Sequence, residues 1–338
     1  DTLSLHDALP IWHCDQRSWA GWLSNHDRGE LDPLSLRALT AARKLGQDVE
    51  AVVIGKDGAG VAGVVGEYGA KVLHVATHAD ITDYTPQASG RALKDLVEKL
   101  NPAAVIAAGS PRGNEQLAHL AAFLDAPMAS DCSSITLGSP HVVQRARWAG
   151  NLIEEANVHS PLLIASIFPF STEPESANAG AATVSEFQPT LEASDTVVRV
   201  LSRDSGESKS GGVTLTDAKV IVSGGRGVGG PEGFSKLEEL AALMEGTVGC
   251  SRVVTASGWR PHAEQVGQTG SKVAPDLYIA CGISGAMQHI AGMKNSKTIV
   301  VINTDPEAPI LNYADYAIIG DLHQVLPALT SAVREAKG

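Results

Sequence analysis

The sequence predicts an α/β protein with two domains, each with a mostly parallel sheet flanked by helices. Short apolar runs alternate with segments whose apolar residues recur at helical spacing, which is the pattern of βαβ units. This alternation occurs twice, before and after a stretch rich in Ser, Glu, Gly and Ala. The 338 residues, 43% of them hydrophobic, are enough for two ordinary cores.

In the N-terminal half, helical and apolar segments follow each other in a regular order. We expect helices over 34–45 and 91–100 and strands over 49–55, 71–76 and 103–109. After Met128 the pattern changes, and residues 141–167 predict strands joined by a tight turn at 149–151. This part is expected to be a structural ribbon added to the sheet.

A polar stretch separates the two alternations. Within residues 171–217, the segment RDSGESKSGG has the composition of a flexible linker. We therefore place an N-terminal α/β domain at 26–204, a linker at 205–217 and a C-terminal domain at 218–338. Residues 1–25 are expected to be a non-native leader, because DTLSLHDALPIWHCDQRSW lacks an initiating Met and any periodicity.

The C-terminal domain restarts the alternation and is expected to have a Rossmann-like arrangement. The expected strands are 218–225, 247–254, 276–282, 297–303 and 316–320, and the expected helices are 234–245, 286–293 and 322–336. Ligands of such open sheets bind at the carboxyl ends of the strands. The polar residues that follow these strands are therefore the candidate site.

Composition and charge exclude several classes of function. The formal net charge of −12 and the pI near 5.3 make a nucleic-acid partner unfavourable. The four cysteines show no metal-ligand spacing, so neither zinc nor an iron–sulfur centre is expected, and the thiols should be reduced and mostly buried. No apolar run is long enough to span a bilayer, so stable membrane insertion is not expected.

Two glycine-containing turns are candidate phosphate sites. The turn SGGRGVGG at 223–230 lets backbone amides approach a phosphate, and Arg226 can pair with a pyrophosphate, although many glycine turns bind nothing. Ser284, Gly285 and Ala286 lie where a strand turns into a helix, whose positive end favours an anion. Asn303 and Asp321 follow the next strands, where a turn residue and a helix N-cap are equally good explanations.

Several longer segments carry a family resemblance. SGGRGVGGPEGF, GCSR, GWRPHAEQVGQTG, PDLYIACGISGAMQHIAGMKNSKTIVVIN and DPEAPI occur in order between Val220 and Leu322. Together they resemble the FAD-binding domain of the electron transfer flavoprotein (ETF) alpha subunit, the ETF alpha/FixB family. Weaker resemblance in HDRGELDPLSLRALTAARKLG and AAGSPRGNEQLAHLAAFLDAPMASDCSSI extends it to nearly everything after His26.

The resemblance implies a set of FAD-binding residues. They are Arg226, Ser251, Arg252, Val266, Gly267, Gln268, Thr269, Ser284, Gly285, Ala286, Met287, Gln288, His289, Asn303, Asp321 and Leu322. It implies further that Arg252 lies over the flavin ring, that Thr269 is near N5 and that His289 donates to the C2 carbonyl. Donors and cations there favour the negatively charged reduced flavin, which raises its potential.

The same resemblance implies the function. The chain is expected to be a redox carrier without substrate turnover of its own, and we find no nucleophile–base pair in the sequence. It would pair with a beta subunit that carries AMP, accept electrons from acyl-CoA dehydrogenases in fatty acid β-oxidation and amino acid catabolism, and pass them to an ETF-quinone oxidoreductase. The expected location is the cytoplasm of a bacterium or the mitochondrial matrix of a eukaryote.

One departure and two alternatives accompany this interpretation. TASG at 255–258 stands where the family commonly has Val-Asp-Ala before the glycine, so a peripheral interaction is in doubt. An NAD-dependent enzyme is an alternative, because strand–glycine–helix units also bind nicotinamide cofactors. A FixB-type or electron-bifurcating subunit is another, and a second flavin on the partner would distinguish it.

Overall fold

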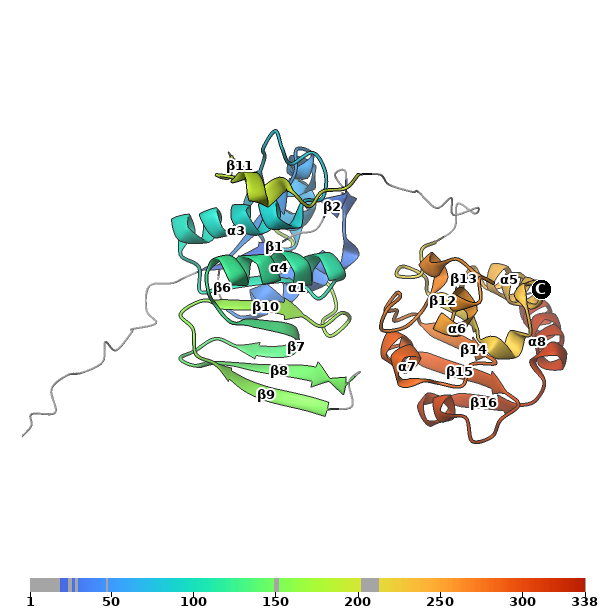
Figure 1. Cartoon of the computed structure of the whole chain (residues 1–338). Coiled ribbons are helices and arrows are strands. Elements are labelled where there is room, and N and C mark those ends of the chain that lie inside the picture. The colour runs from blue at the N-terminus through green and yellow to red at the C-terminus, as the bar shows by residue number, and fades with distance from the viewer. Residues whose placement is uncertain are drawn as a thin grey trace, which may run out of the picture. The chain divides into compact units, whose positions relative to one another are not determined.

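The computed structural model describes residues 19–23, 26–27, 30–46, 48–148, 152–201 and 213–337, with side chains from residue 31 onward. Two compact units are present (Figure 1). The first unit contains the described residues up to 147 together with 152–201, and the second contains Trp148 and the described residues from 213 onward. The predicted linker and leader lie mostly outside the described residues. Within the leader range, residues 19–23 form a strand.

Among the described residues of the first unit, nine strands form one sheet in the order β11-β5-β4-β1-β6-β10-β7-β8-β9. The strands from β11 to β7 pair in parallel, and β7, β8 and β9 pair antiparallel. The strands are β1 (Trp19–Leu23), β4 (Asp48–Ile54), β5 (Val72–Ala76), β6 (Ala104–Ala108), β7 (Met128–Thr136), β8 (His141–Arg147), β9 (Leu152–Val158), β10 (Leu163–Ile167) and β11 (Thr183–Phe187). A separate pair, β2 (His26–Asp27) and β3 (Glu30–Leu31), is antiparallel.

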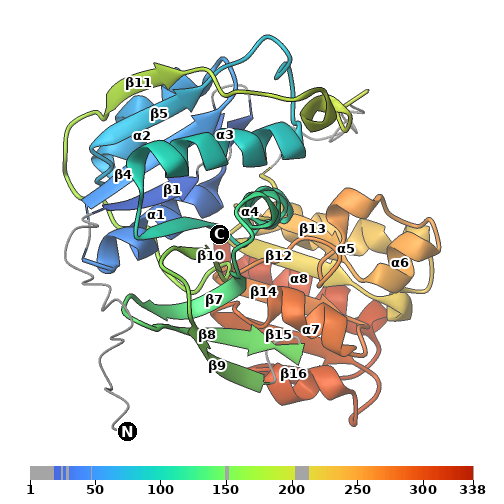
Figure 2. The same ribbon diagram turned by 60° about the vertical axis from the view of Figure 1, so that its left-hand side comes forward.

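Helices cover both faces of this sheet (Figure 2). They are α1 (Pro33–Lys44), η1 (Gly58–Val61), α2 (Ala62–Glu67), α3 (Pro86–Leu100), α4 (Pro111–Phe123) and η3 (Ala193–Thr196). Successive residues of β4 point to opposite faces, so Val53 joins the core under α1 and α2 while Val52 joins the core under α3 and α4. Parallel strands buried on both faces are typically apolar throughout, as β6 is.

Most expected elements of this unit are confirmed, with some differences. Helix α3 begins at Pro86, five residues before the predicted start at Arg91, because Pro is favourable in the first turn. Strand β11 was not predicted, since its mostly polar residues form an edge strand with exposed side chains. The antiparallel ribbon β8–β9 is present, and its turn at 149–151 lies outside the described residues.

The second unit has five described strands, all parallel, in the order β13-β12-β14-β15-β16. The strands are β12 (Val220–Gly224), β13 (Thr247–Cys250), β14 (Leu277–Cys281), β15 (Thr298–Asn303) and β16 (Tyr316–Ile319). The helices are η4 (Arg226–Val228), η5 (Pro231–Gly233), α5 (Phe234–Leu243), α6 (Arg252–Ala256), η6 (His262–Glu264), α7 (Met287–Met293), η7 (Pro309–Tyr313) and α8 (Leu322–Lys337). The fold class predicted from the sequence is thus confirmed for both units.

The second unit also has a core on each face of its sheet. Ile221 of β12 packs with Ile290 and Met293 of α7, whereas its neighbour Val222 packs with Phe234 of α5 and Leu326 of α8. The expected strand over 247–254 was too long, because β13 ends at Cys250 and helix α6 begins at Arg252. Because β13 ends early, the loop that follows it is short and lies beside the loop that follows β12.

The order of the strands places the ligand site. The chain goes from β12 to β13 on one side and then returns to β14 on the other side of β12. The loops after β12 and β14 therefore leave the sheet at a topological switch point, where open α/β sheets bind ligands. No helix in the part of the chain that the structure describes is both long and apolar enough to cross a membrane.

Candidate functional site

A cavity of about 570 Å³ lies at the carboxyl ends of the strands of the second unit. Its walls come from the loops that follow each of the five strands. This volume is within the range of small-molecule and cofactor sites. The cavity is thus at the edge where the strand order predicts a ligand.

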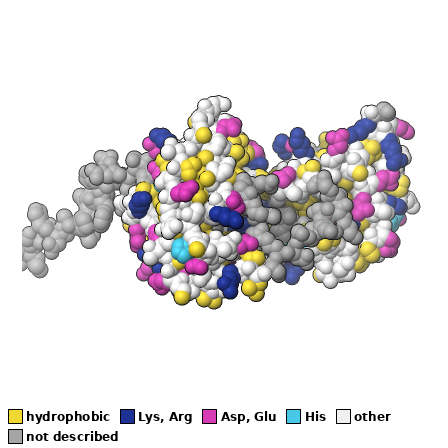
Figure 3. All heavy atoms as spheres, turned by 90° about the horizontal axis from the view of Figure 1, so that it is seen from above, with side chains coloured by type: hydrophobic (Ala, Val, Ile, Leu, Met, Phe, Trp, Pro, Cys, Tyr) yellow, Lys and Arg dark blue, Asp and Glu magenta, His cyan; other side chains and the backbone are white. Residues whose placement is uncertain are grey.

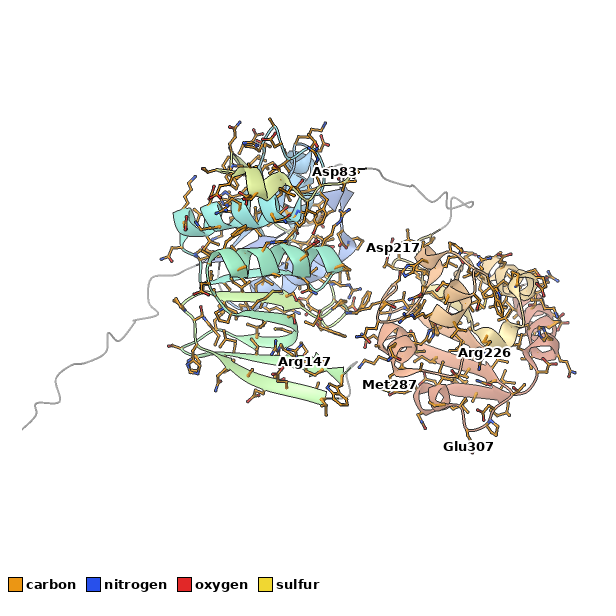
Figure 4. All side chains as sticks on the ribbon, viewed as in Figure 1. Asp83, Arg147, Asp217, Arg226, Met287 and Glu307 are labelled. Atoms are coloured by element: carbon orange, nitrogen blue, oxygen red, sulfur yellow. The ribbon has the colours of Figure 1, made fainter. Side chains whose placement is uncertain are left out.

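The predicted site residues come together in this cavity, with one exception. Those in its lining are Arg226, Ser251, Arg252, Val266, Gly267, Gln268, Thr269, Ser284, Gly285, Ala286, Gln288, His289, Asn303, Asp321 and Leu322. Met287 is outside the lining and its side chain is 42% exposed at the start of α7. Figure 4 marks Met287 and Arg226 in the second unit.

The lining also contains residues that the sequence analysis did not select. They are Gly227, Val253, Ala256, Gln265, Gly282, Ile283, Thr304, Asp305, Ala308 and Gly320. Most of them are direct neighbours of predicted residues, so a wider window around each strand end would have found them. Gln265 is also adjacent to a predicted residue, Val266, but it is 2% exposed and its role depends on the side chains of Thr255 and Thr269.

Backbone crowding between the loops after β12 and β14 requires glycine. Gly225 N donates to the Cys281 carbonyl at 2.9 Å, and Gly227 N donates to the Gly282 carbonyl at 3.0 Å. A Cβ atom at Gly225 would lie 2.3 Å from the Gly282 carbonyl oxygen. Gly282 has a φ of +62°, and its added Cβ would lie 2.7 Å from the Gly227 Cα. The glycines therefore hold the two loops together at the cavity wall.

Two arginines in the cavity wall make no ion pair with a described carboxylate, although Asp305 and Asp321 also belong to the lining. Arg226 and Arg252 line the cavity and are exposed, and neither has a carboxylate partner among the described residues. By contrast, Arg260 in the same unit pairs with Glu264 and Glu238. Unpaired guanidinium groups in a cavity are suited to phosphate or another delocalised anion.

His289 brings a buried and incompletely bonded imidazole to the cavity. Its side chain is 6% exposed, and Nε2 lies 3.0 Å from the hydroxyl of Tyr278. Nδ1 is buried and makes no well-formed hydrogen bond among the described residues, although the Val266 backbone interacts with the ring. Burial lowers the pKa of His289 to about 4, and the neighbouring Val266 backbone offsets this only in part. His289 is therefore neutral near pH 7, with a polar atom left for a ligand.

Asn303 and Asp321 line the cavity, but their side chains also have structural partners. Asn303 Nδ2 donates to the Ile283 carbonyl at 2.9 Å, and its Oδ1 accepts from Asp305 N. Asp321 Oδ1 accepts from His323 N at 2.9 Å, which satisfies an amide in the first turn of α8. The turn residue and the helix cap considered from the sequence are thus both present.

The turn from 284 to 286 is fixed by backbone contacts. Ile310 N donates to the Ser284 carbonyl at 3.2 Å. Gly285 has a φ of +91°, and an added Cβ would lie 2.4 Å from Ile310 N. No side chain caps α7, which begins directly after Ala286. The backbone of this turn therefore lies in the cavity wall, packed against Ile310.

Three of the four cysteines belong to the described residues, and all three are buried. Cys132, Cys250 and Cys281 are free and buried, as expected, and burial raises the pKa of each thiol to about 12. Cys14 lies outside the described residues. Within the described part of the chain, no three His, Cys, Asp or Glu side chains are placed to hold a metal ion. Acidic and basic side chains are interspersed on the face that Figure 3 shows.

Family models match both units of the chain. Residues 21–192 match the electron transfer flavoprotein domain, and residues 214–294 match the electron transfer flavoprotein FAD-binding domain. The second match contains the loops after β12, β13 and β14 and thus most of the cavity. The first match begins inside β1, within the range predicted as a leader.

Relatives of similar length are about one third identical to this chain. The electron transfer flavoprotein subunit alpha of Bacillus subtilis is 36% identical, and the alignment covers 91% of this chain and 94% of the relative. Protein FixB of Clostridium saccharobutylicum is 36% identical, with 93% and 96% covered. The "Probable electron transfer flavoprotein subunit alpha, mitochondrial" of Caenorhabditis elegans is 36% identical, with 92% of each covered.

The matches agree with what the cavity offers. FAD has two phosphates, for which the unpaired arginines are suited, and a flat ring with acceptor atoms, to which buried polar groups can donate. The matched residues in order, the cavity and the two-unit fold thus lead to one conclusion. The chain belongs to the electron transfer flavoprotein alpha subunit/FixB family, and it is an electron carrier whose second unit is an FAD-binding domain.

Proposed function

We propose that this electron carrier accepts electrons from acyl-CoA dehydrogenases and passes them to an ETF-quinone oxidoreductase. In this role it serves fatty acid β-oxidation and amino acid catabolism. Bound FAD supplies the reversible uptake of electrons at its ring. The protein supplies binding, orientation and electrostatics, for which the residues of the cavity are suited.

The observation that carries the proposal is the set of donors in the lining of the cavity. Arg252 has no carboxylate partner among the described residues, Thr269 is exposed in the lining, and His289 is neutral with an unbonded Nδ1. A cation and neutral donors favour a ring that gains negative charge over one that is uncharged. We assign redox tuning to these three residues and phosphate binding to Arg226.

We also propose that the chain works as a heterodimer. Its first unit matches the electron transfer flavoprotein domain, and the relatives are described as alpha subunits, which supports a beta subunit as the partner. AMP is expected on that beta subunit. The location would be the cytoplasm in a bacterium or the mitochondrial matrix in a eukaryote, and the relatives include both bacterial and mitochondrial proteins.

The experiment is a redox titration of the heterodimer with Arg252→Ala. The potential at which bound flavin takes up its first electron should fall by about 60 mV or more, which corresponds to about 1.4 kcal/mol of lost stabilisation. Arg334→Ala is a matched control, because Arg334 is also exposed but pairs with Glu239 on α5 and is outside the cavity lining. Equal potentials for Arg252→Ala and the control would refute the role of Arg252.

A FixB-type or bifurcating carrier is the second candidate. The observation that favours it is the 36% identity to Protein FixB, the same as to the Bacillus subtilis alpha subunit. Two flavins per purified heterodimer would support it, whereas one flavin would support the dehydrogenase-linked carrier. The NAD-dependent alternative has less support, because the matched model is that of an FAD-binding domain.

A further inference from the structure

A chain of side-chain hydrogen bonds leads from α6 to the cavity. Thr255 Oγ1 donates to Gln265 Oε1 at 2.7 Å, and Gln265 Nε2 donates to Thr269 Oγ1 at 3.0 Å. Gln265 is 2% exposed, whereas Thr269 is exposed in the cavity lining. Thr255 belongs to the TASG segment that departs from the family pattern.

The two distances agree with one orientation of the Gln265 amide. Contacts of the O–H···O type are usually about 2.7 to 2.8 Å, and those of the N–H···O type about 2.9 to 3.0 Å. The 2.7 Å contact to Thr255 fits the first type, and the 3.0 Å contact to Thr269 fits the second. A flipped amide would reverse both assignments and would fit neither distance as well.

Thr255 is the residue that fixes this orientation. Its hydroxyl has one proton and two acceptors nearby, Gln265 Oε1 at 2.7 Å and the Arg252 carbonyl at 3.0 Å. The shorter contact goes to Gln265, whose amide is buried and costly to leave without a partner. With Oε1 held by Thr255, the amide nitrogen of Gln265 is directed to Thr269.

The consequence for Thr269 concerns its own proton. A hydroxyl that accepts from Gln265 keeps its O–H for a different acceptor. Because Thr269 lines the cavity, that acceptor is supplied by the ligand, and FAD has carbonyl oxygens and ring nitrogens that can accept. If the Gln265 amide were flipped, the Thr269 hydroxyl could donate to Gln265 Oε1. Its proton would then not be available to an acceptor on the ligand.

We propose that Thr255 and Gln265 are positioning residues that hold Thr269 as a hydrogen-bond donor toward the FAD ring. Neither of the two acts on the ring directly in this role. The proposal rests on the proposed function, in which the ring-binding end of the cavity contains Thr269. It adds residues whose effect on the flavin potential should depend entirely on the Thr269 hydroxyl.

The test is a double-mutant cycle on the flavin-loaded heterodimer. Thr255→Val removes the Thr255 hydroxyl at nearly constant volume, and Thr255→Ser keeps a hydroxyl there. Thr269→Val removes the hydroxyl that Thr255 and Gln265 are proposed to position. Thr330→Val is the matched control, since Thr330 is 5% exposed on α8 and lies outside the cavity lining. The readout is the potential for the first electron, measured with the flavin retained by each variant.

Thr255→Val should weaken the preference for reduced over oxidised flavin by up to about tenfold, a fall of about 59 mV for one electron. Thr255→Ser and Thr330→Val should keep the wild-type potential. In the Thr269→Val background, Thr255→Val should have no further effect, because a positioning residue has nothing left to position.

Two results would overturn the inference. An equal fall with and without the Thr269 hydroxyl would show that Thr255 acts through packing, and no fall for Thr255→Val would show that Thr255 does not orient the amide. Arg252→Ala, titrated in parallel, separates this failure from failure of the proposed function. If Arg252→Ala also leaves the potential unchanged, the assignment of the ring to this end of the cavity is at fault.

Discussion

The two units have the same layered architecture but differ in how several of their polar side chains are paired. In the first unit, Ser110 caps α4 through Gly113 N, and Arg91 pairs with Asp195. In the second unit, Arg226 and Arg252 have no carboxylate partner among the described residues, and Nδ1 of His289 has no hydrogen bond. Buried polar atoms without a hydrogen bond occur in both units, among them Gln116 Oε1 and Asp131 Oδ1 in the first. A ligand is therefore indicated by the combination of such an atom with unpaired arginines in one cavity, as in the second unit.

The largest expected difference between the two units concerns one glycine in each. Gly282 of the second unit and Gly46 of the first both have positive φ, +62° and +76°. A Cβ at Gly282 would lie 2.7 Å from Gly227 Cα, but a Cβ at Gly46 would meet nothing within 4 Å. Gly282→Ala should therefore lower the free energy of unfolding by about 2 to 5 kcal/mol and release FAD, and Gly46→Ala by only about 1 kcal/mol.

Thermal unfolding and flavin absorbance of both glycine variants are the measurements. Similar losses in the two would mean that crowding between the loops after β12 and β14 is unimportant. A stable Gly282→Ala that keeps its flavin would contradict the described cavity wall.

The arginines give the next largest effect. Arg91 is 17% exposed and its partner Asp195 only 2%, so Arg91→Ala should lower the free energy of unfolding by about 2 kcal/mol, less than for a fully buried pair. Arg226→Ala should change the free energy of unfolding of the FAD-free protein by less than about 0.5 kcal/mol, because Arg226 is exposed and has no carboxylate partner among the described residues.

The same Arg226→Ala variant should instead lose about tenfold or more in FAD affinity. Flavin content after dialysis and urea unfolding of the FAD-free protein measure the two properties. If Arg226→Ala destabilised the protein as much as Arg91→Ala does, the contrast between structural and ligand-binding arginines would be wrong.

The smallest effect concerns pH. Burial lowers the pKa of His289 to about 4 in the folded state, whereas an unfolded histidine titrates near 6.5. The unfolded state therefore binds more protons between these values, and stability falls as the pH decreases from 6.5 toward 4. When the pH falls from 6.5 to 5, the free energy of unfolding should decrease by about 1 to 2 kcal/mol more for wild type than for His289→Gln.

Urea unfolding of the FAD-free protein at several pH values would check this. Parallel pH profiles for wild type and His289→Gln would show that His289 does not titrate as a buried neutral group.

The periodicity of apolar residues predicted most of the buried strands, but it did not predict the polar edge strand or the helix that follows β13. Most parallel strands of both units were found because apolar residues on both faces leave continuous runs, as in β6 and β14, but β1 was not, because its residues lie in the range predicted as a leader. The edge strand β11 was missed because its side chains are exposed and polar. Helix α6 was missed because Val253 and Val254 extend an apolar run past the point where β13 ends.

The candidate site was predicted in part for a similar reason. Residues next to strand ends, such as Arg226 and His289, are found from topology and resemblance, and the structure brings them to one cavity. Gln265 was missed because its importance depends on contacts with Thr255 and Thr269, and sequence spacing does not show hydrogen bonds between loops. Their assigned roles stay predictions until they are measured.

The central claim is that the cavity of the second unit binds FAD through side chains that the protein leaves without partners. The most direct test is the ratio of FAD to protein after dialysis of the wild-type heterodimer and of the Arg226→Ala, Arg252→Ala double variant. We predict about one FAD per alpha chain for wild type and nearly complete loss from a double variant that remains folded. Full retention of FAD by the folded double variant would contradict the claim.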